Sequence, residues 1–459
     1  MTTQSGLPGD LLTPMLDALG PGPSSNVRVV GAGSLPSAFR VTDLAVAAIA
    51  AAGICLDRLV GMDEQQRPRT ITVDRALASH WLHLSIRPDG WALPPAWDPL
   101  TGDYRASDGW IRLHMNAPRH RAAAVNLLGV ASDRGEVAEV VRRWTVGELE
   151  QAVVDAGGAA AAMRSIEQWQ RHQQGRSVRA EPLIWHESTG PAVPHRDLRG
   201  VGTRGPLARV RVLDLTRVLA GPVATRLLAG WGADVLRIDP PDWDEPAVVP
   251  EVMLGKKTAR LDLRIDADRE RFTDLLSGTD VLVHGYRADA LENLGFGQHV
   301  RDNIRPGLID VALNAYGWTG PWKRRRGFDS LVQMSCGIAE QGMRTYQRGR
   351  PSPLPVQALD HATGYLIAAA AIRGLADRRG NGLGSRWRVS LARIAQLLVD
   401  AGPQDPVGGA PLAEPTLMDA IEDTTWGPAQ RIHPPLAVAD LPLRWDRPAR
   451  ALGTDAANW

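Results

Sequence analysis

Asp360 is the residue whose type and position best suit covalent chemistry in this sequence. It lies in the segment 358–364 (ALDHATG), at the start of an alanine-rich stretch that predicts a helix. A carboxylate can attack an electrophilic carbon and form a covalent intermediate, which divides a difficult reaction into easier steps. An aspartate there can also cap the helix that begins near His361. The segment alone favours the cap, and the two roles are compatible.

A second group of residues could bind an anion. Gly221 stands in the turn between a predicted strand at 210–215 and a predicted helix at 222–231. A glycine lets a ligand approach the backbone, and a helix N-terminus attracts negative charge, although a tight turn without a ligand fits the segment better. Lys256 and Lys257 are adjacent in a chain that has only one other lysine, Lys323. The chain lacks a dinucleotide fingerprint and a Walker A motif.

Composition narrows the classes of function. The chain has 459 residues, 44% of them hydrophobic, which excludes a disordered or fibrous protein. The 52 basic and 51 acidic residues give a net charge of +1, so we expect no nucleic-acid partner. The histidines 114, 120 and 172 lack the spacing of metal ligands, so we expect no metal site.

The same composition predicts a cytoplasmic location. Two cysteines, Cys55 and Cys336, are too few for a disulfide framework and favour a reducing compartment. Residues 1–20 lack the pattern of a signal peptide. The longest apolar run, 44–56, is shorter than the ~20 residues that span a bilayer, so we expect no membrane association.

The elements that position Asp360 belong to a repeated unit. Residues 35–59 and 354–378 each begin with Leu-Pro and continue as an alanine-rich helix, and strand-like segments follow at 70–74 and 386–390. Gapless alignment on Leu-Pro places Val41 opposite Asp360, and Asp43 reaches that position only with a gap. We therefore predict one active site per chain and a structural role for the first copy.

Strand and helix patterns alternate from residue 207, which predicts an α/β protein with a Rossmann-like parallel sheet and a smaller α/β domain. Ligands of such a sheet bind at the carboxyl ends of its strands. The sequence predicts five units. They are a first copy of the repeated unit that packs with the large domain (31–85), a small domain (86–186), a linker (187–206), the large catalytic domain (207–400) and an irregular Pro-rich tail (401–459).

Residues 214–241 (DLTRVLAGPVATRLLAGWGADVLRIDPP) resemble the opening signature of the family III CoA transferases, a family that also holds alpha-methylacyl-CoA racemase. Further similar segments follow in the family's order at 255–263, 280–287, 291–295, 327–331 and 358–364. The small domain resembles the family's through 108–125 and 163–175. In the family that domain follows the catalytic half, so the resemblance implies permuted halves here.

The resemblance implies an acyl-CoA:carboxylate CoA transferase in which Asp360 matches the catalytic aspartate. Acyl-CoA and a small carboxylic acid would be the substrates, CoA would pass through an aspartyl-CoA thioester, and no tightly bound cofactor is expected. Family members are interlocked dimers, which implies a homodimer. The residues that match CoA-binding positions, or that could form a cationic rim or packing surface there, are Val218, Leu219, Arg237, Lys256, Lys257, Tyr286 and Arg287.

Departures from the family concern the acyl pocket more than the CoA half. His284-Gly285 and Asn314-Ala315 stand where Glu-Asn and Ser-Gly pairs are usual in the family.

Two alternatives remain. A racemase would use a histidine directly before the aspartate of the Gly-x-Asp motif, but that position is Phe328, which cannot move a proton. His361 is a poor substitute because adjacent helical residues point about 100° apart. The other alternative is a catalytically inactive CoA-binding protein.

Overall fold

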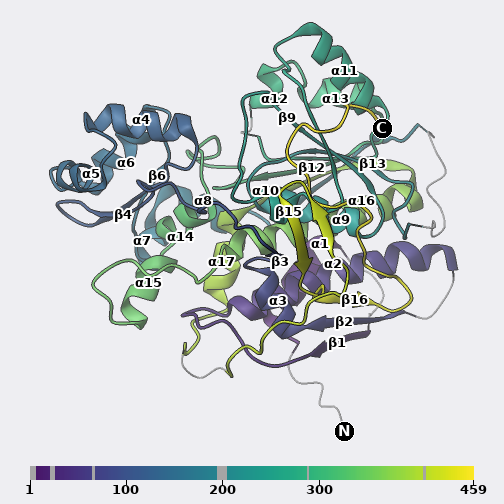
Figure 1. Cartoon of the computed structure of the whole chain (residues 1–459), viewed down its shortest axis with the longest axis horizontal. Coiled ribbons are helices and arrows are strands. Elements are labelled where there is room, and N and C mark those ends of the chain that lie inside the picture. Colours follow the sequence, from purple (N-terminus) through teal and green to yellow (C-terminus); the bar gives the residue numbers. More distant parts are fainter. Residues whose placement is uncertain (1–6, 21–25, 65–67, 194–203, 287–288, 407–409) are drawn as a thin grey trace.

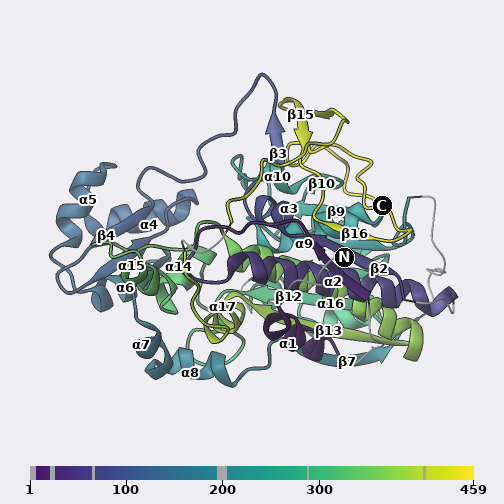
Figure 2. The ribbon, with the colours of Figure 1, turned by 90° about the horizontal axis from the view of Figure 1, so that it is seen from below.

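The computed structural model describes residues 7–20, 26–64, 68–193, 204–286, 289–406 and 410–459. A large α/β body occupies most of the molecule, and a smaller lobe that carries α4, α5 and α6 lies at its side (Figure 1). The N-terminal elements and the end of the chain both lie against the large body (Figures 1 and 2).

The large body is built on a seven-stranded sheet of order β10-β9-β8-β11-β12-β13-β7. The first six strands of this order are parallel, and β7 is antiparallel to β13. Numbered along the chain from β8, the parallel strands follow the Rossmann order 3-2-1-4-5-6, which confirms the predicted fold class. The strands are β7 (Trp185–Pro191), β8 (Arg211–Leu215), β9 (Asp234–Asp239), β10 (Lys257–Arg260), β11 (Val281–His284), β12 (Ile309–Asn314) and β13 (Leu383–Ser390).

Alternate residues of these strands face two separate hydrophobic cores, because successive side chains of a strand point to opposite faces. Val212 and Val235 pack with α9 and α16, whereas their neighbours Leu213 and Leu236 pack with α11. The helices of the large body are α9 (Ala220–Gly230), α10 (Val249–Val252), α11 (Asp266–Ser277), α12 (Ala290–Asn293), α13 (Gln298–Ile304), α14 (Asp329–Ser335), α15 (Ile338–Thr345), α16 (Ala358–Asn381) and α17 (Leu391–Asp400).

The N-terminal segment adds a helix layer outside α16. Its α2 packs along α16, and both helices contribute to the same core cluster. Its strands β1 and β2 form a three-stranded sheet with β16 (Leu436–Val438) of the C-terminal tail, in the order β1-β2-β16. The elements are α1 (Gly9–Leu19), β1 (Asn26–Val30), α2 (Val41–Glu64), β2 (Thr70–Asp74), α3 (Arg75–Trp81) and β3 (Ile86–Pro88).

The two copies of the repeated unit have the same order of helix, strand and helix. α2 and α16 each have 24 residues, and each is followed by a strand and then by a helix. The last residue of each strand caps the next helix: Asp74 accepts from the Leu77 N–H, and Ser390 accepts from the Arg393 N–H. Counted from the helix starts, Asp43 is the third residue of α2 as Asp360 is of α16, which agrees with the gapped alignment and not with the gapless one.

One helix segment among the described residues, Val41–Met62, is long and apolar enough to cross a membrane by length and composition alone. The expectation that the longest apolar run is too short is therefore wrong for the helix that contains it. In this structure 89% of its most apolar window is buried, as in the core helix of a globular protein.

The small domain has its own core beneath a three-stranded antiparallel sheet of order β4-β5-β6. A second contact cluster joins it to α14 through Trp110, Met163 and Phe328. Its elements are β4 (Gly102–Arg105), β5 (Trp110–Leu113), α4 (Pro118–Leu128), α5 (Arg134–Val141), α6 (Val146–Asp155), β6 (Ala160–Ala162), α7 (Ile166–Arg171) and α8 (Gln173–Ala180).

Two boundaries differ from the prediction. Residues 187–191, expected in a linker, belong to β7 at the edge of the large sheet. The Pro-rich tail is more ordered than expected because it completes two sheets: β15 pairs with β3, and β16 pairs with β2. Its strands are β14 (Glu422–Thr424), β15 (Gly427–Arg431) and β16 (Leu436–Val438).

Candidate active site

A pocket of about 360 Å³ lies at the carboxyl ends of β8, β11 and β12 and contains Asp360; we call it the Asp360 pocket. The strand order reverses between β8 and β11, and ligands of open parallel sheets bind at such a switch point. The small domain closes one side with residues from α4, and the loop before α14 contributes another wall. Asp360 is the one carboxylate among the described residues that line the pocket.

Asp360 is the third residue of α16, and 9% of it is exposed. The start of α16 can pack close to α9 because Gly364 has no side chain: a Cβ there would lie 2.5 Å from the carbonyl oxygen of Ala220 on α9. The alternative role of Asp360 as a helix cap is wrong, since Gln357 is the N-cap and makes no side-chain cap. The Asp360 carboxylate is therefore available to the pocket.

Asp329, the first residue of α14, supplies the missing cap from another helix. Its Oδ2 accepts the backbone N–H of Asp360 at 2.9 Å, and its other oxygen accepts from the amide of Gln333. Asp329 lies in the segment 327–331 that is similar to the family, but the segment alone predicts no role for it. Only the juxtaposition of α14 and α16 indicates one.

The two aspartates form a buried carboxylate pair. Burial, followed by the negative charge of Asp329, holds the pKa of Asp360 well above its usual value. Burial raises the pKa of Asp329 to about 6, although its hydrogen bonds oppose the shift. Both effects favour the protonated form, so the pair resists carrying two negative charges at once.

The loop from β8 to α9 lines the pocket through Val218 and Leu219, as the resemblance implies. Val218 adopts a φ of 64°, a conformation that is uncommon for a β-branched residue. Its backbone N–H donates to Glu245 at 2.8 Å, which holds the loop in this conformation. Gly221 admits the side chain of Thr216, which a Cβ would meet at 2.3 Å, so the glycine serves loop packing rather than a ligand.

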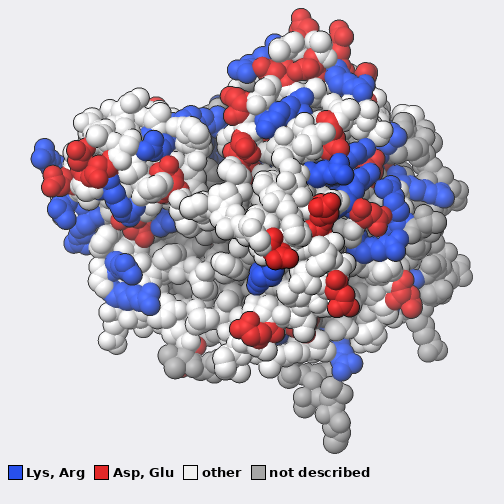
Figure 3. Space-filling view, in the orientation of Figure 1, with Lys and Arg blue, Asp and Glu red and all other residues white. Residues whose placement is uncertain are grey.

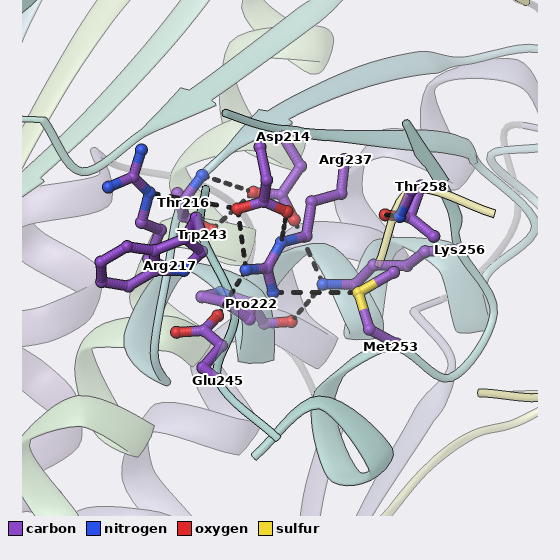
Figure 4. A network of polar contacts seen from close by, with 12 residues as sticks. Asp214, Thr216, Arg217, Pro222, Arg237, Trp243, Glu245, Met253, Lys256 and Thr258 are labelled. Atoms are coloured by element: carbon purple, nitrogen blue, oxygen red, sulfur yellow. Dashed lines mark hydrogen bonds and ion pairs between the residues drawn. The ribbon is translucent and has the colours of Figure 1, made fainter. Parts of the chain in front are cut away.

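Lys256 and Arg237 do not form the predicted cationic rim. Both side chains are completely buried behind the β8–α9 loop (Figure 4). Lys256 donates to Asp214 at 3.1 Å and to the carbonyl oxygen of Pro222 at 2.9 Å. Arg237 pairs with Asp239 and Glu245. Buried charges need such partners, so these cations support the loop instead of meeting a ligand.

Burial lowers the pKa of Lys256 to about 8, although Asp214 opposes the shift. Arg237 remains charged because Glu245 and Asp239 more than offset its burial and raise its pKa.

The other predicted binding residues differ in whether they line the pocket. Tyr286 lines the pocket. Lys257 is not among the lining residues and contacts Asp234 and the carbonyl oxygen of Asn458, each at 3.2 Å. Arg287 lies outside the described residues.

Basic residues that are not among the predicted binding residues line the pocket instead. They are Arg119 from α4, Arg217 from the β8–α9 loop, and Lys323, Arg324, Arg325 and Arg326, which we call the basic run 323–326. Arg217 lies over the rings of Trp243 (4.3 Å) and Tyr286 (5.4 Å). Four consecutive cations in the sequence were the available signal.

Among the described residues, six basic side chains and one acidic side chain line the pocket. On the face of the molecule shown in Figure 3, basic and acidic side chains are interspersed.

The structure shows where two of the histidines and the residues that differ from the family lie relative to the pocket. Among the described residues, no group of three or more His, Cys, Asp or Glu side chains could hold a metal ion. His120 lines the Asp360 pocket, whereas His114 stacks on Phe328 with ring centroids 3.8 Å apart. The departures at Gly285, Asn314 and Ala315 all line the pocket as well.

Comparison with known proteins finds several that are similar in sequence to this chain. An acyl-CoA transferase of Gibberella moniliformis is 28% identical over 344 residues, 67% of this chain and 60% of that protein. Succinyl-CoA:glutarate CoA-transferase of Mus musculus is 32% identical and matches 39% of this chain and 44% of that protein. The chain spans about half the length of the curated relatives it matches.

A crystal structure of Rv3272 from M. tuberculosis is 32% identical, covering 42% of this chain and 54% of that chain with a TM-score of 0.39. Residues 207–431 match the family model described as CoA-transferase family III. This segment contains the β8–α9 loop, the basic run 323–326 and Asp360. The segment 207–431 belongs to CoA-transferase family III.

Proposed function

We propose that the protein transfers CoA from an acyl-CoA to a carboxylic acid, with Asp360 as the nucleophile. The observation that carries this proposal is the position of Asp360 as the one lining carboxylate, among the described residues, of a pocket rich in cations. Family membership and relatives named acyl-CoA transferases support acyl-CoA as the substrate.

The proposed reaction has two halves. The Asp360 carboxylate attacks the thioester carbonyl carbon, which forms a mixed anhydride and releases CoA thiolate. The thiolate attacks the Asp360 carbonyl of the anhydride, which leaves an aspartyl-CoA thioester and frees the first acid. A second acid then attacks the aspartyl-CoA thioester, and the same steps in reverse produce the new acyl-CoA and regenerate the carboxylate.

The environment of Asp360 suits this sequence. A mixed anhydride must be kept from water, and Asp360 is 9% exposed among the apolar lining residues Leu219, Phe328 and Leu391. A desolvated carboxylate is also a better nucleophile than a hydrated one, once it has lost its proton.

The phosphates of CoA require cations, and the described pocket offers Arg217, Lys323 and Arg324. Lys323 and Arg324 are exposed, so they can reach a ligand at the pocket mouth. Trp243 and Tyr286 add aromatic surface on which an adenine ring could stack.

The proposal is tested by trapping the covalent intermediate. The protein is incubated with a panel of acyl-CoA thioesters, treated with hydroxylamine and digested for peptide mass spectrometry. A modified peptide that contains Asp360 supports transfer, and the Asp360→Asn variant serves as the control. Solvent deuterium at the α-carbon without CoA exchange would instead indicate an isomerase, and neither signal would indicate a CoA-binding protein without activity.

We further propose a cytoplasmic homodimer. The family resemblance supports the dimer, and the two cysteines, both free and buried, agree with a reducing compartment. Light scattering coupled to size-exclusion chromatography tests the dimer, and fractionation of the source cells tests the location.

A further inference from the structure

His120 is a buried imidazole whose polar atoms have no protein partner. It is 2% exposed, and neither Nδ1 nor Nε2 makes a hydrogen bond within the part of the chain that the structure describes. Its ring lines the Asp360 pocket. A buried polar group without a partner costs about 1–3 kcal/mol, so a ligand that satisfies it gains affinity.

The surroundings hold this ring in place. His120 lies in the first turn of α4, which Pro118 opens. Its ring meets the ring of Phe328 edge to face, with centroids 5.8 Å apart and planes at 66°. Phe328 immediately precedes Asp329, whose carboxylate binds the Asp360 N–H. His120 is therefore fixed by the small domain beside the segment that positions Asp360.

The imidazole is uncharged at neutral pH. Burial, followed by the positive charges of Arg119 and Arg326, lowers the pKa of His120 to about 4. A neutral imidazole has one N–H donor and one acceptor nitrogen. Among the cations that line this pocket, a carboxylate is the ligand group that can accept the N–H and be attracted by the surrounding charge.

We propose that His120 donates a hydrogen bond to the carboxyl oxygen of the acid substrate in the Asp360 pocket. This proposal rests on the proposed CoA-transferase function and assigns the acid-binding contact to the small domain. The leaving and entering acids occupy the same place in the two half-reactions, so one contact serves both. His120 transfers no proton in this role.

Two substitutions separate hydrogen bonding from packing. His120→Phe keeps an aromatic ring against Phe328 but has no donor, whereas His120→Gln keeps a donor and loses the ring. Aspartyl-CoA enzyme, formed with acyl-CoA in the absence of hydroxylamine, is mixed with increasing concentrations of the free acid that corresponds to the acyl-CoA used. We expect His120→Phe to raise the acid concentration for half-maximal turnover about tenfold or more, as for one lost hydrogen bond to a charged group. His120→Gln should recover most of this loss.

Binding of CoA and the melting temperature are the controls. Both should stay close to the wild-type values in His120→Gln. The matched variant is His114→Phe, because His114 also stacks on Phe328 but is not among the residues that line the pocket. His114→Phe should leave the acid dependence unchanged. An unchanged acid dependence in His120→Phe would overturn the proposal. A wild-type acid dependence in His120→Phe together with a weakened one in His120→Gln would indicate that the ring acts by packing. Incorporation of solvent deuterium at the substrate α-carbon that His120→Phe abolishes would indicate that His120 acts as a base, and this result would also overturn the proposal.

A second measurement distinguishes failure of this proposal from failure of the proposed function. If wild-type protein forms no aspartyl-CoA, CoA transfer fails, yet the His120 contact can still be observed. The imidazole ¹⁵N signals are recorded with CoA present and sodium acetate added, and His120→Gln assigns the signal. A shift of that signal with acetate supports the contact, and its absence overturns it.

Discussion

The carboxylate of Asp329 accepts the backbone N–H of Asp360 at 2.9 Å, so one buried aspartate both orients the other and opposes its ionisation. The hydrogen bond ties the start of α16 to the start of α14, and α14 in turn packs on β6 of the small domain. The position of the proposed nucleophile therefore depends on both domains.

Asp329→Asn should shift the acid limb of the pH–activity profile to lower pH. Transfer requires ionised Asp360, and the variant removes the negative charge that contributes to its raised pKa while keeping an oxygen to accept the Asp360 N–H. Burial remains the larger cause of the raised pKa, so the shift is partial. Initial rates measured across the acid range test this, and a limb that stays in place or moves to higher pH contradicts it.

The same pair should lower the wild-type free energy of unfolding as pH rises through about 6, the pKa of Asp329. An acid whose pKa is raised in the folded state holds a proton that the unfolded chain releases, so its stabilisation is present at low pH and is lost as pH rises. Asp329→Asn should flatten this dependence between pH 4 and 7. Urea unfolding at a series of pH values measures it.

Asp360→Asn should reduce CoA transfer about a thousandfold or more, since it removes the proposed nucleophile. Asp43→Asn is the matched control, because Asp43 is the equivalent third residue of α2. Its carboxylate is already paired with Arg40 and Arg75, so we expect wild-type turnover. A large loss in Asp43→Asn would show that the first copy takes part in catalysis.

Lys256→Met should destabilise the protein by about 3–5 kcal/mol, because it removes the ammonium that pairs with the completely buried Asp214 carboxylate. Lys257→Met changes the adjacent residue, whose pair with Asp234 is partly exposed, and should cost about 0–1 kcal/mol. Chemical denaturation of the two variants compares them directly. Equal losses would contradict the different roles of these neighbours.

Gly364→Ala should destabilise by about 1–3 kcal/mol, since the added methyl group would lie 2.5 Å from the backbone oxygen of Ala220 and push α16 from α9. Gly380→Ala, on the same helix, meets only the end of the Met62 side chain at 3.5 Å. That control should be neutral or stabilising by up to about 1 kcal/mol. Thermal unfolding of both variants provides the comparison.

Lys323→Ala combined with Arg324→Ala should weaken CoA binding about tenfold at low ionic strength, and less at high salt, because exposed charges are screened. Lys257→Ala should bind CoA as wild type does, since Lys257 lies away from the pocket. Calorimetric titration with CoA at two salt concentrations tests both statements.

Much of the fold is readable from local patterns. The strands at 210–215 and 281–284 follow from short apolar runs, and both long helices follow from alanine-rich segments. The strands of the tail are not predictable from local patterns, because they are short and gain stability only by pairing with β2 and β3, which are distant in sequence.

The sequence by itself determined the alternation of strands and helices, the resemblance to the family and the candidacy of Asp360, because these rest on local order along the chain. Tertiary structure decided which charges meet solvent. It buries Lys256 against Asp214, brings Asp329 to the Asp360 N–H, and places His120 in the pocket. Burial and pairing across elements depend on distances in space, and the spacing of residues along the sequence does not determine those distances.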